Sequence, residues 1–218
     1  DISMKTLDDG TDRRIAEIIL TDELPNGSGF VRYLYNNFQN ILAEAMIPPD
    51  PTNYLGQIHS TTHQRGCKDA CYDCLKVYRN MNYHSLLDWK LGLSMIRVMS
   101  DATYVCGTDG NFNDYIELND WLAFATELRN SFAQSFGFTH LSEINGLPVI
   151  KFGRNQKNVI MIIHPFWDLR NIREANWLAE TKAEIDEYTN SRNGMVSIVD
   201  TFNLHRRPGW CYEKLVNR

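Results

Sequence analysis

The chain has 218 residues, of which 43% are hydrophobic, and its formal net charge at pH 7 is -5. This length is enough to bury one substantial core or two modest ones. The negative net charge excludes nucleic-acid binding through a generally basic surface.

We expect neither a membrane span nor an export signal in this sequence. No stretch approaches the ~20 apolar residues that cross a bilayer, and residues 1–4 lack the basic and then apolar pattern of a signal peptide. We therefore expect a protein of the cytoplasm with reduced cysteines and no membrane partner. Because the chain begins at Asp1 without an initiator methionine, we also expect it to be a piece of a longer polypeptide.

Hydrophobic periodicity predicts the elements of the first half in chain order. A strand is expected over residues 14–20, ending in an acidic turn at 21–23. A Gly-rich turn at 25–29 then leads into a helix of about four turns that starts at Phe30 and stops before Pro48. A short helix over 74–81 and a longer one over 84–99 follow.

The turn-rich stretch 107–111 predicts a boundary between a first domain, residues 1–108, and a second, residues 109–218. The second domain should open with a helix capped by Asn119 or Asp120 and stopped by Gly137. A hairpin of strands 147–152 and 159–164, a helix containing residues 178–188 and a strand over 195–200 complete an α-β-β-α-β order. The predicted fold class is α+β, with a small zinc-knuckle α/β domain followed by this α-β-β-α-β domain.

Three of the five cysteines, Cys67, Cys71 and Cys74, fall in one short segment with the spacing Cys-x3-Cys-x2-Cys. This spacing lets thiolates converge on a tetrahedral metal and predicts a structural zinc site. His84 is the predicted fourth ligand because it begins an amphipathic helix, and His59 and His63 are alternatives within reach of the same loop. Unpaired buried thiols and a disulfide are the competing interpretations of the cysteines.

Two groups of basic residues are candidates for contact with nucleic-acid phosphates: Arg65, Lys68, Lys76 and Arg79 around the cysteines, and Arg206 and Arg207 beside Trp210. A cation next to an exposed ring can grip a backbone and stack on a base. The alternative for the first group is an ordinary solvated surface. The alternative for the second is a core aromatic residue with arginines paired to acidic neighbours.

The block Gly66-Cys67-x3-Cys71-Tyr72-x-Cys74-Leu75-x-x-Tyr78-x-Asn80 and the helix start His84-x-x-Leu87-Asp88 carry a resemblance to a known family. Together with the acidic turn and Gly-rich helix entry at residues 22–35, they make residues 14–99 similar to the MrfA-type zinc-binding domain. That domain occurs at the C-terminal end of many bacterial superfamily 2 helicases and in the DISARM defence subunit DrmB. Some members have four knuckle cysteines where this chain has three.

The resemblance implies an accessory role in antiphage defence or DNA repair, in which the zinc module braces a helicase core or its DNA path. The chain has no Walker A loop and no Asp-Glu-x-His box, so the motor is expected upstream or in a partner chain. DNA and this motor are thus the expected partners, and Zn2+ is the expected cofactor. A scaffold that binds protein and not DNA is a further alternative.

The second half resembles the segment that often follows this module, through the runs His164-Pro165-Phe166-Trp167 and 200–208. Its α-β-β-α-β order is also similar to the core of PD-(D/E)xK nucleases, which need an Asp and a Glu-x-Lys on adjacent strands to hold a divalent metal. The predicted strands carry no such carboxylates, and the single Glu-x-Lys, at Glu180 to Lys182, falls on a predicted helix. We therefore expect a structural or degenerate domain, with a metal-dependent nuclease as the alternative.

Overall fold

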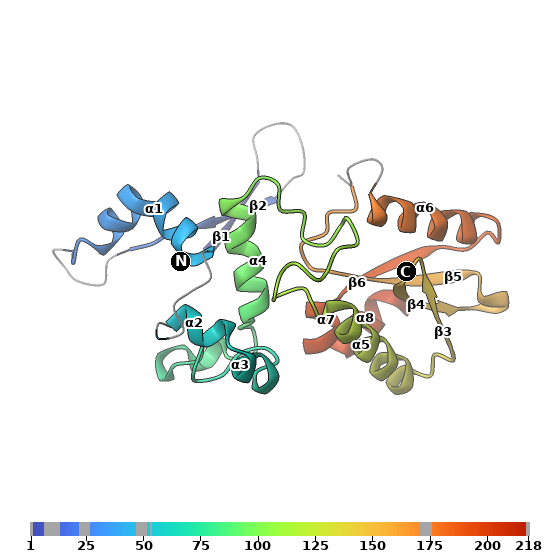
Figure 1. The fold of residues 1–218 in the computed structure, drawn as a ribbon. Helices are drawn as coiled ribbons and strands as arrows, with labels where there is room; N and C mark the ends of the chain where they lie inside the picture. The colour runs from blue at the N-terminus through green and yellow to red at the C-terminus, as the bar shows by residue number, and fades with distance from the viewer. Residues whose placement is uncertain are drawn as a thin grey trace. The chain divides into compact units, whose positions relative to one another are not determined.

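A computed structural model describes residues 2–6, 14–21, 27–46, 52, 54–170 and 176–216 (Figure 1). The chain separates into two compact units, Asp1–Ile47 and Pro48–Arg218. The predicted boundary near residue 108 falls inside the second unit. The acidic turn and the start of the Gly-rich turn, predicted at residues 22–26, lie outside the described residues.

The first unit contains two strands and one helix. Strands β1 (Ile2–Thr6) and β2 (Arg14–Ile18) pair antiparallel, with Ile2 opposite Ile18. Helix α1 (Phe30–Met46) begins at Phe30 as predicted. Along this helix Leu42 is buried, whereas Phe30 and Tyr35 are exposed.

The segment around the cysteines is helical on both sides of a loop. It contains α2 (Tyr54–His59), α3 (Thr61–Gly66), the 3-10 helix η1 (Tyr78–Tyr83) and α4 (Trp89–Ser100). The short helix predicted over 74–81 is therefore this 3-10 helix, shifted toward the C-terminus. The longer helix begins at Trp89 and not at His84, because the side chain of Asp88 accepts hydrogen bonds from the backbone N–H groups of Lys90 and Leu91.

The rest of the second unit is built on one sheet. Its elements are α5 (Trp121–Phe136), β3 (His140–Ile144), β4 (Leu147–Phe152), η2 (Arg154–Gln156), β5 (Asn158–Ile163), α6 (Trp177–Asn190), β6 (Val196–Asp200), α7 (Thr201–Arg206) and α8 (Pro208–Val216). The strands lie in the order β3-β4-β5-β6, antiparallel except for the parallel pair β5 and β6. The fold is α+β, as predicted, and the predicted hairpin is β4 and β5. Strand β3 and the helices α7 and α8 are additional to the predicted order.

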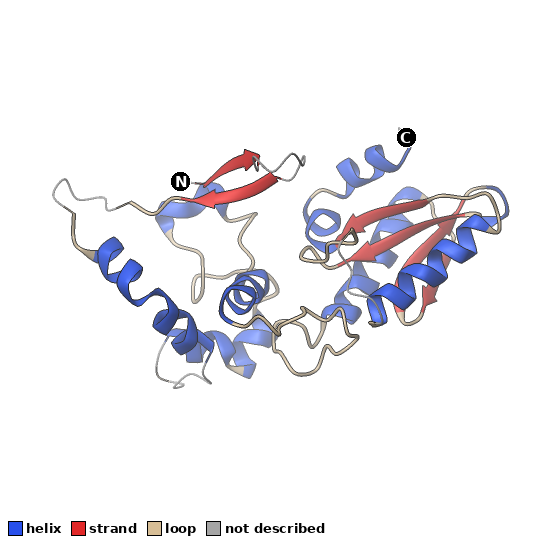
Figure 2. Ribbon diagram, turned by 90° about the horizontal axis from the view of Figure 1, so that it is seen from above, coloured by secondary structure: helices blue, strands red, loops and turns tan. Residues whose placement is uncertain are grey.

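Helices cover both faces of this sheet. Helix α6 lies on one face and α5 on the other (Figures 1 and 2). Accordingly β4 and β5 are nearly continuous apolar runs, and Val149, Ile150, Ile160 and Met161 are almost completely buried. The predicted stop of α5 is confirmed, since Gly137 adopts a left-handed conformation with φ 74° after the last turn.

Gly194 marks the place where the chain enters β6 beside β5. A Cβ atom on Gly194 would lie 1.8 Å from the carbonyl oxygen of Lys157. The backbone N–H of Val159 bonds to the carbonyl of Met195 at 3.0 Å, which fixes this close approach. Only a residue without a side chain fits between the two backbones.

Within the described ranges, no helix combines the length and apolar character that crossing a membrane requires.

Candidate metal centre

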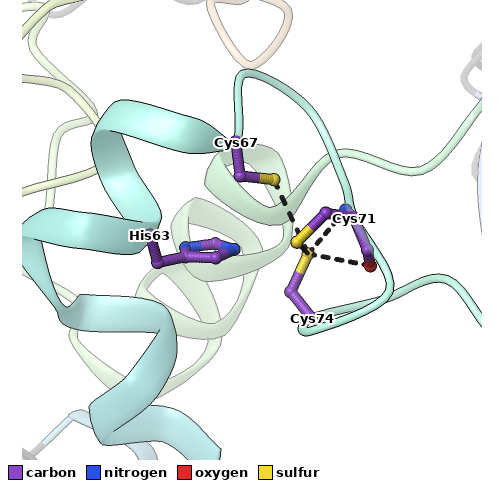
Figure 3. A group of neighbouring side chains, drawn as sticks. All are labelled: His63, Cys67, Cys71 and Cys74. Carbon is purple, nitrogen blue, oxygen red and sulfur yellow. Dashed lines mark hydrogen bonds between the residues drawn. The ribbon is translucent and has the colours of Figure 1, made fainter.

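Four side chains converge between α3 and the loop that follows it. The possible ligand atoms of His63, Cys67, Cys71 and Cys74 all lie within 4.8 Å of one another. Figure 3 shows the imidazole of His63 pointing toward the three sulfur atoms. The structure thus brings together the three predicted cysteines and adds one of the alternative histidines.

The spacing of the sulfur atoms matches a tetrahedral zinc site. Zinc–sulfur bonds of about 2.3 Å at tetrahedral angles place neighbouring sulfur atoms about 3.8 Å apart. The Sγ of Cys74 lies 3.8 Å from that of Cys67 and 3.7 Å from that of Cys71. All five cysteines are free thiols, so the disulfide interpretation does not apply. The donor set of three thiolates and one imidazole is a common set for structural zinc.

Helix α3 positions two of the four groups. Ser60 caps the helix by accepting a hydrogen bond from the backbone N–H of His63 at 3.2 Å. At the other end, the backbone N–H of Cys67 bonds to the carbonyl of His63 at 2.8 Å. His63 and Cys67 are four residues apart and therefore share one face of the helix.

The loop after α3 positions the other two groups, the thiols of Cys71 and Cys74. The backbone N–H of Cys71 donates to the Sγ of Cys74 at 3.0 Å, and the N–H of Lys76 donates to the carbonyl of Cys71 at 2.9 Å. Cys67 and Cys74 are buried and Cys71 is half-buried. The loop thus holds its sulfur atoms in place through backbone hydrogen bonds.

The hydrogen bonds of His63 leave one ring nitrogen available for a metal. Its Nδ1 lies 2.9 Å from the carbonyl oxygen of Ile58, and only a protonated Nδ1 can donate to this acceptor. The other nitrogen, Nε2, is buried and has no hydrogen-bond partner among the described residues. This tautomer presents the Nε2 lone pair, which is the usual arrangement of a histidine whose other nitrogen is held by a carbonyl.

Trp89, the first residue of α4, supports the centre from outside. Its indole N–H donates to the carbonyl of Cys67 at 3.1 Å, and its backbone N–H bonds to the carbonyl of Asp69 at 2.9 Å. The ring also meets the ring of His63 edge-on, with centroids 5.3 Å apart. The start of α4 is therefore tied directly to the cysteine loop.

The buried thiol of Cys67 is harder to ionise than an ordinary thiol. Burial and the neighbouring thiols raise the pKa of Cys67 above its ordinary value. A bound dication reverses this effect, because it stabilises thiolates directly. The residues present therefore fit a zinc ion, with His63, Cys67, Cys71 and Cys74 as its ligands.

His84, the predicted fourth ligand, is not part of this group. Its Nε2 lies 3.0 Å from the carbonyl of Val77 and 2.9 Å from the amide oxygen of Asn80. The ring thus closes the η1 turn and also meets the ring of Tyr72 edge-on. The other alternative, His59, lies outside the group as well, and burial lowers its pKa.

The candidate nucleic-acid-binding residues occupy different environments. Arg65, Lys68 and Arg79 are exposed and Lys76 is half-buried. Lys68 also pairs with Glu127 at 3.4 Å, where both side chains are exposed. Arg207 is exposed and its guanidinium lies 4.3 Å from the ring centroid of Trp210.

Arg206 makes structural contacts. It donates hydrogen bonds to the carbonyl oxygens of Ser85 at 2.6 Å and Leu87 at 2.9 Å, and it lies 3.5 Å from the carboxylate of Asp88. Only 11% of its side chain is exposed. Arg206 thus fastens α7 to the segment that leads into α4, which is the acidic pairing that the sequence left as an alternative.

The residues considered for a nuclease are spread over separate elements. Glu180 lies in the first turn of α6, where Lys182 pairs with Asp186. Asp200 caps α7 by accepting from the backbone N–H of Asn203 at 2.8 Å. Strands β4 and β5 contain no Asp or Glu in their sequences.

A buried Cys106 and His164 pair, which the sequence did not reveal, lies in the α/β part of the second unit. The Sγ of Cys106 is 3.4 Å from Nδ1 of His164. Burial raises the pKa of Cys106 to about 11 and lowers that of His164 to about 3. Both groups are therefore neutral at pH 7, unlike the thiolate of a catalytic cysteine.

Comparison of the chain with protein-family models, with curated proteins and with solved structures found no match.

Substitution of His63 tests the ligand set. We expect His63→Ala to weaken zinc binding by more than the about 10–100-fold that loss of an outer hydrogen-bond partner costs. Competition with a chromophoric chelator measures this affinity. His84→Ala is the matched control and should leave the affinity unchanged, because its ring contacts Val77 and Asn80 and not the sulfur atoms. The reverse pattern would make His84 the ligand.

Proposed function

We propose that the chain is a structural zinc-binding accessory region of a bacterial DNA helicase or translocase system, in antiphage defence or DNA repair. In this proposal the motor lies upstream or in a partner chain, and the region acts in the cytoplasm. The observation that carries it is the His63 and three-cysteine group, whose ligand atoms lie within 4.8 Å of one another. The resemblance of residues 14–99 to helicase-associated zinc modules supplies the rest.

A structural role for the metal follows from the number of protein donors. Four donors fill the tetrahedral coordination that zinc adopts in structural sites, whereas catalytic sites use three protein ligands and a water. The four groups come from α3 and the following loop, and Trp89 ties α4 to them. The metal would therefore fix the relative positions of α3, the loop and α4.

The proposed DNA contact draws support from the surface around this centre. Arg65 and Arg79 are exposed there, and the residues Tyr72 and Tyr78 are 70% and 84% exposed. Cations combined with exposed aromatic rings suit a single strand, since cations contact phosphates and rings stack on bases. The overall charge of -5 confines such a contact to a local patch.

Fluorescence anisotropy with labelled single-stranded and duplex oligonucleotides tests this function. We expect the whole chain to bind DNA with an affinity that falls as salt rises from about 50 to 200 mM, because bound cations displace counterions. The variant Arg65→Gln/Arg79→Gln should bind more weakly, with a salt slope lower by about 0.7 per lost contact on a single strand.

The control removes two exposed arginines elsewhere in the second unit, as Arg154→Gln/Arg192→Gln, and should behave like the unmodified chain. A chain that binds neither oligonucleotide at low salt would contradict the DNA-binding part of the proposal.

That outcome would favour the second candidate, a protein-interaction scaffold. Its support is the number of large apolar side chains that η1 and the next residues expose, namely Tyr78, Met81, Tyr83 and Leu86. Surfaces of this kind mark protein contacts when they form one patch. A nuclease has less support, because Glu180 and Asp200 lie on separate elements and strands β4 and β5 contain no Asp or Glu.

A further inference from the structure

The second unit contains a pocket of about 210 Å3 between the start of α4 and the α/β part. Asp88 and Lys90, at the start of α4, line it together with Glu117, Trp121 and Phe124. Arg206, which fastens α7 to the segment before α4, also borders it. The pocket is therefore built from segments that are distant in sequence and held together by side-chain contacts.

Glu117 is the unusual group in this pocket. Its side chain is 0% exposed, and its Oε1 accepts a hydrogen bond from Nε of Arg97 at 2.5 Å. Its other oxygen, Oε2, is buried and has no hydrogen-bond partner among the described residues. A buried carboxylate oxygen without a donor is costly, so a ligand that brings a donor gains free energy there.

The charges around the pocket favour a cation. Five carboxyl groups line it, on Asp69, Asp88, Glu117, Asp120 and Glu127, against three cationic side chains, on Lys68, Lys90 and Arg206. Arg97 lies outside this lining and pairs with Glu117, so the carboxyl groups exceed the nearby cationic side chains by one, and burial raises the pKa of one of them, Asp88. His164 also lines the pocket and adds no charge, because burial lowers its pKa to about 3.

The three cationic side chains already have acidic partners. Lys90 lies 2.6 Å from Asp120, Lys68 lies 3.4 Å from Glu127 and Arg206 lies 3.5 Å from Asp88. An anionic ligand would have to break these pairs. A cation leaves them in place and meets the unpaired oxygen of Glu117.

We propose that this pocket binds a small organic cation, with its charged nitrogen donating to Oε2 of Glu117 and its apolar body lying against Trp121 and Phe124. Aromatic faces attract cations as well as apolar groups. The volume is below the roughly 300–1,000 Å3 of sites for drug-sized molecules, so the ligand is smaller than those. This binding activity differs from zinc and DNA binding, although Lys68, a candidate for DNA contact, also lines the pocket.

Isothermal titration calorimetry of the whole zinc-loaded chain with benzamidinium, and with its neutral counterpart benzamide, tests the proposal. We expect benzamidinium to bind at least tenfold more tightly, which corresponds to about 1.4 kcal/mol. Equal binding of the two compounds, or no binding of benzamidinium at about 10 mM, would overturn it.

Two variants locate the site. Glu117→Gln keeps the shape of the side chain and removes its charge, so the preference for benzamidinium should disappear. Ala123→Leu adds bulk at an exposed position of α5 that lines the pocket, so it should weaken benzamidinium binding at least tenfold without disturbing the fold. Unchanged binding by Ala123→Leu would refute the location even if Glu117→Gln does not fold. Glu184→Gln, at an exposed position of α6, is the matched control and should bind like the unmodified chain.

Discussion

The Cys74→Ser variant is expected to lose its single equivalent of zinc and, with it, the ordered structure around the cysteine loop. Cys74 is central to the group, because its sulfur atom neighbours those of Cys67 and Cys71 and accepts the N–H of Cys71. Zinc binding in small modules contributes about 10–16 kcal/mol, which is comparable with the 5–15 kcal/mol that stabilises a whole domain. The loss should therefore exceed what the local packing can supply.

Elemental analysis and thermal unfolding followed by circular dichroism measure both effects. Chelation of the unmodified chain should reproduce the result for Cys74→Ser. The buried core that runs from Tyr104 to Cys211 contains none of the four ligands, so its transition should persist. Cys211→Ala removes a thiol outside the group and should retain one equivalent of zinc. A Cys74→Ser chain that keeps its zinc and unfolds at the same temperature as the unmodified chain would refute the metal centre.

The Arg97→Met variant is expected to lose about 3–5 kcal/mol of the free energy of unfolding, because it leaves the carboxylate of Glu117 buried without its counter-ion. The side chains of the pair are 16% and 0% exposed. Arg97 also lies over the ring of Tyr115, with 4.6 Å between the guanidinium carbon and the centroid. Denaturant unfolding at pH 7 measures the change.

The exposed pair of Lys68 and Glu127 provides the control. Its side chains are 73% and 62% exposed, so Lys68→Met should change the stability by only about 0–1 kcal/mol. The double variant Arg97→Met/Glu117→Leu removes both buried charges and should recover much of the lost stability. If Arg97→Met costs no more than Lys68→Met, the pair does not behave as a buried one.

The sequence was sufficient for the features that depend on local spacing. Three cysteines lie within eight residues, and this spacing alone predicted that their sulfur atoms converge. The fourth ligand could not be chosen in this way, because α3 has only six residues and none of them is buried. This helix has no apolar stripe by which the sequence could predict it. The four-residue spacing of His63 and Cys67 was therefore the one available signal for the fourth ligand.

The same reasoning explains the elements of the sheet. Strands β4 and β5 are strongly apolar and joined by a polar turn, so their pairing was predictable. Strand β3 lies at the edge of the sheet, and of its five residues only Ile144 is buried. Its alternation is too weak to distinguish it from a loop. The contact of Arg206 with Ser85 and Leu87 joins positions about 120 residues apart, which no local pattern encodes.

The tight passage at Gly194 gives a criterion for finding distant homologues of this fold. Any chain that brings β6 alongside β5 in the same register must keep the Cα at this point bare, since even a methyl group would strike the carbonyl of the residue that precedes β5. A remote sequence that shares this backbone path should therefore keep a glycine just before its last strand, opposite the end of a hairpin turn, even where its side chains have diverged.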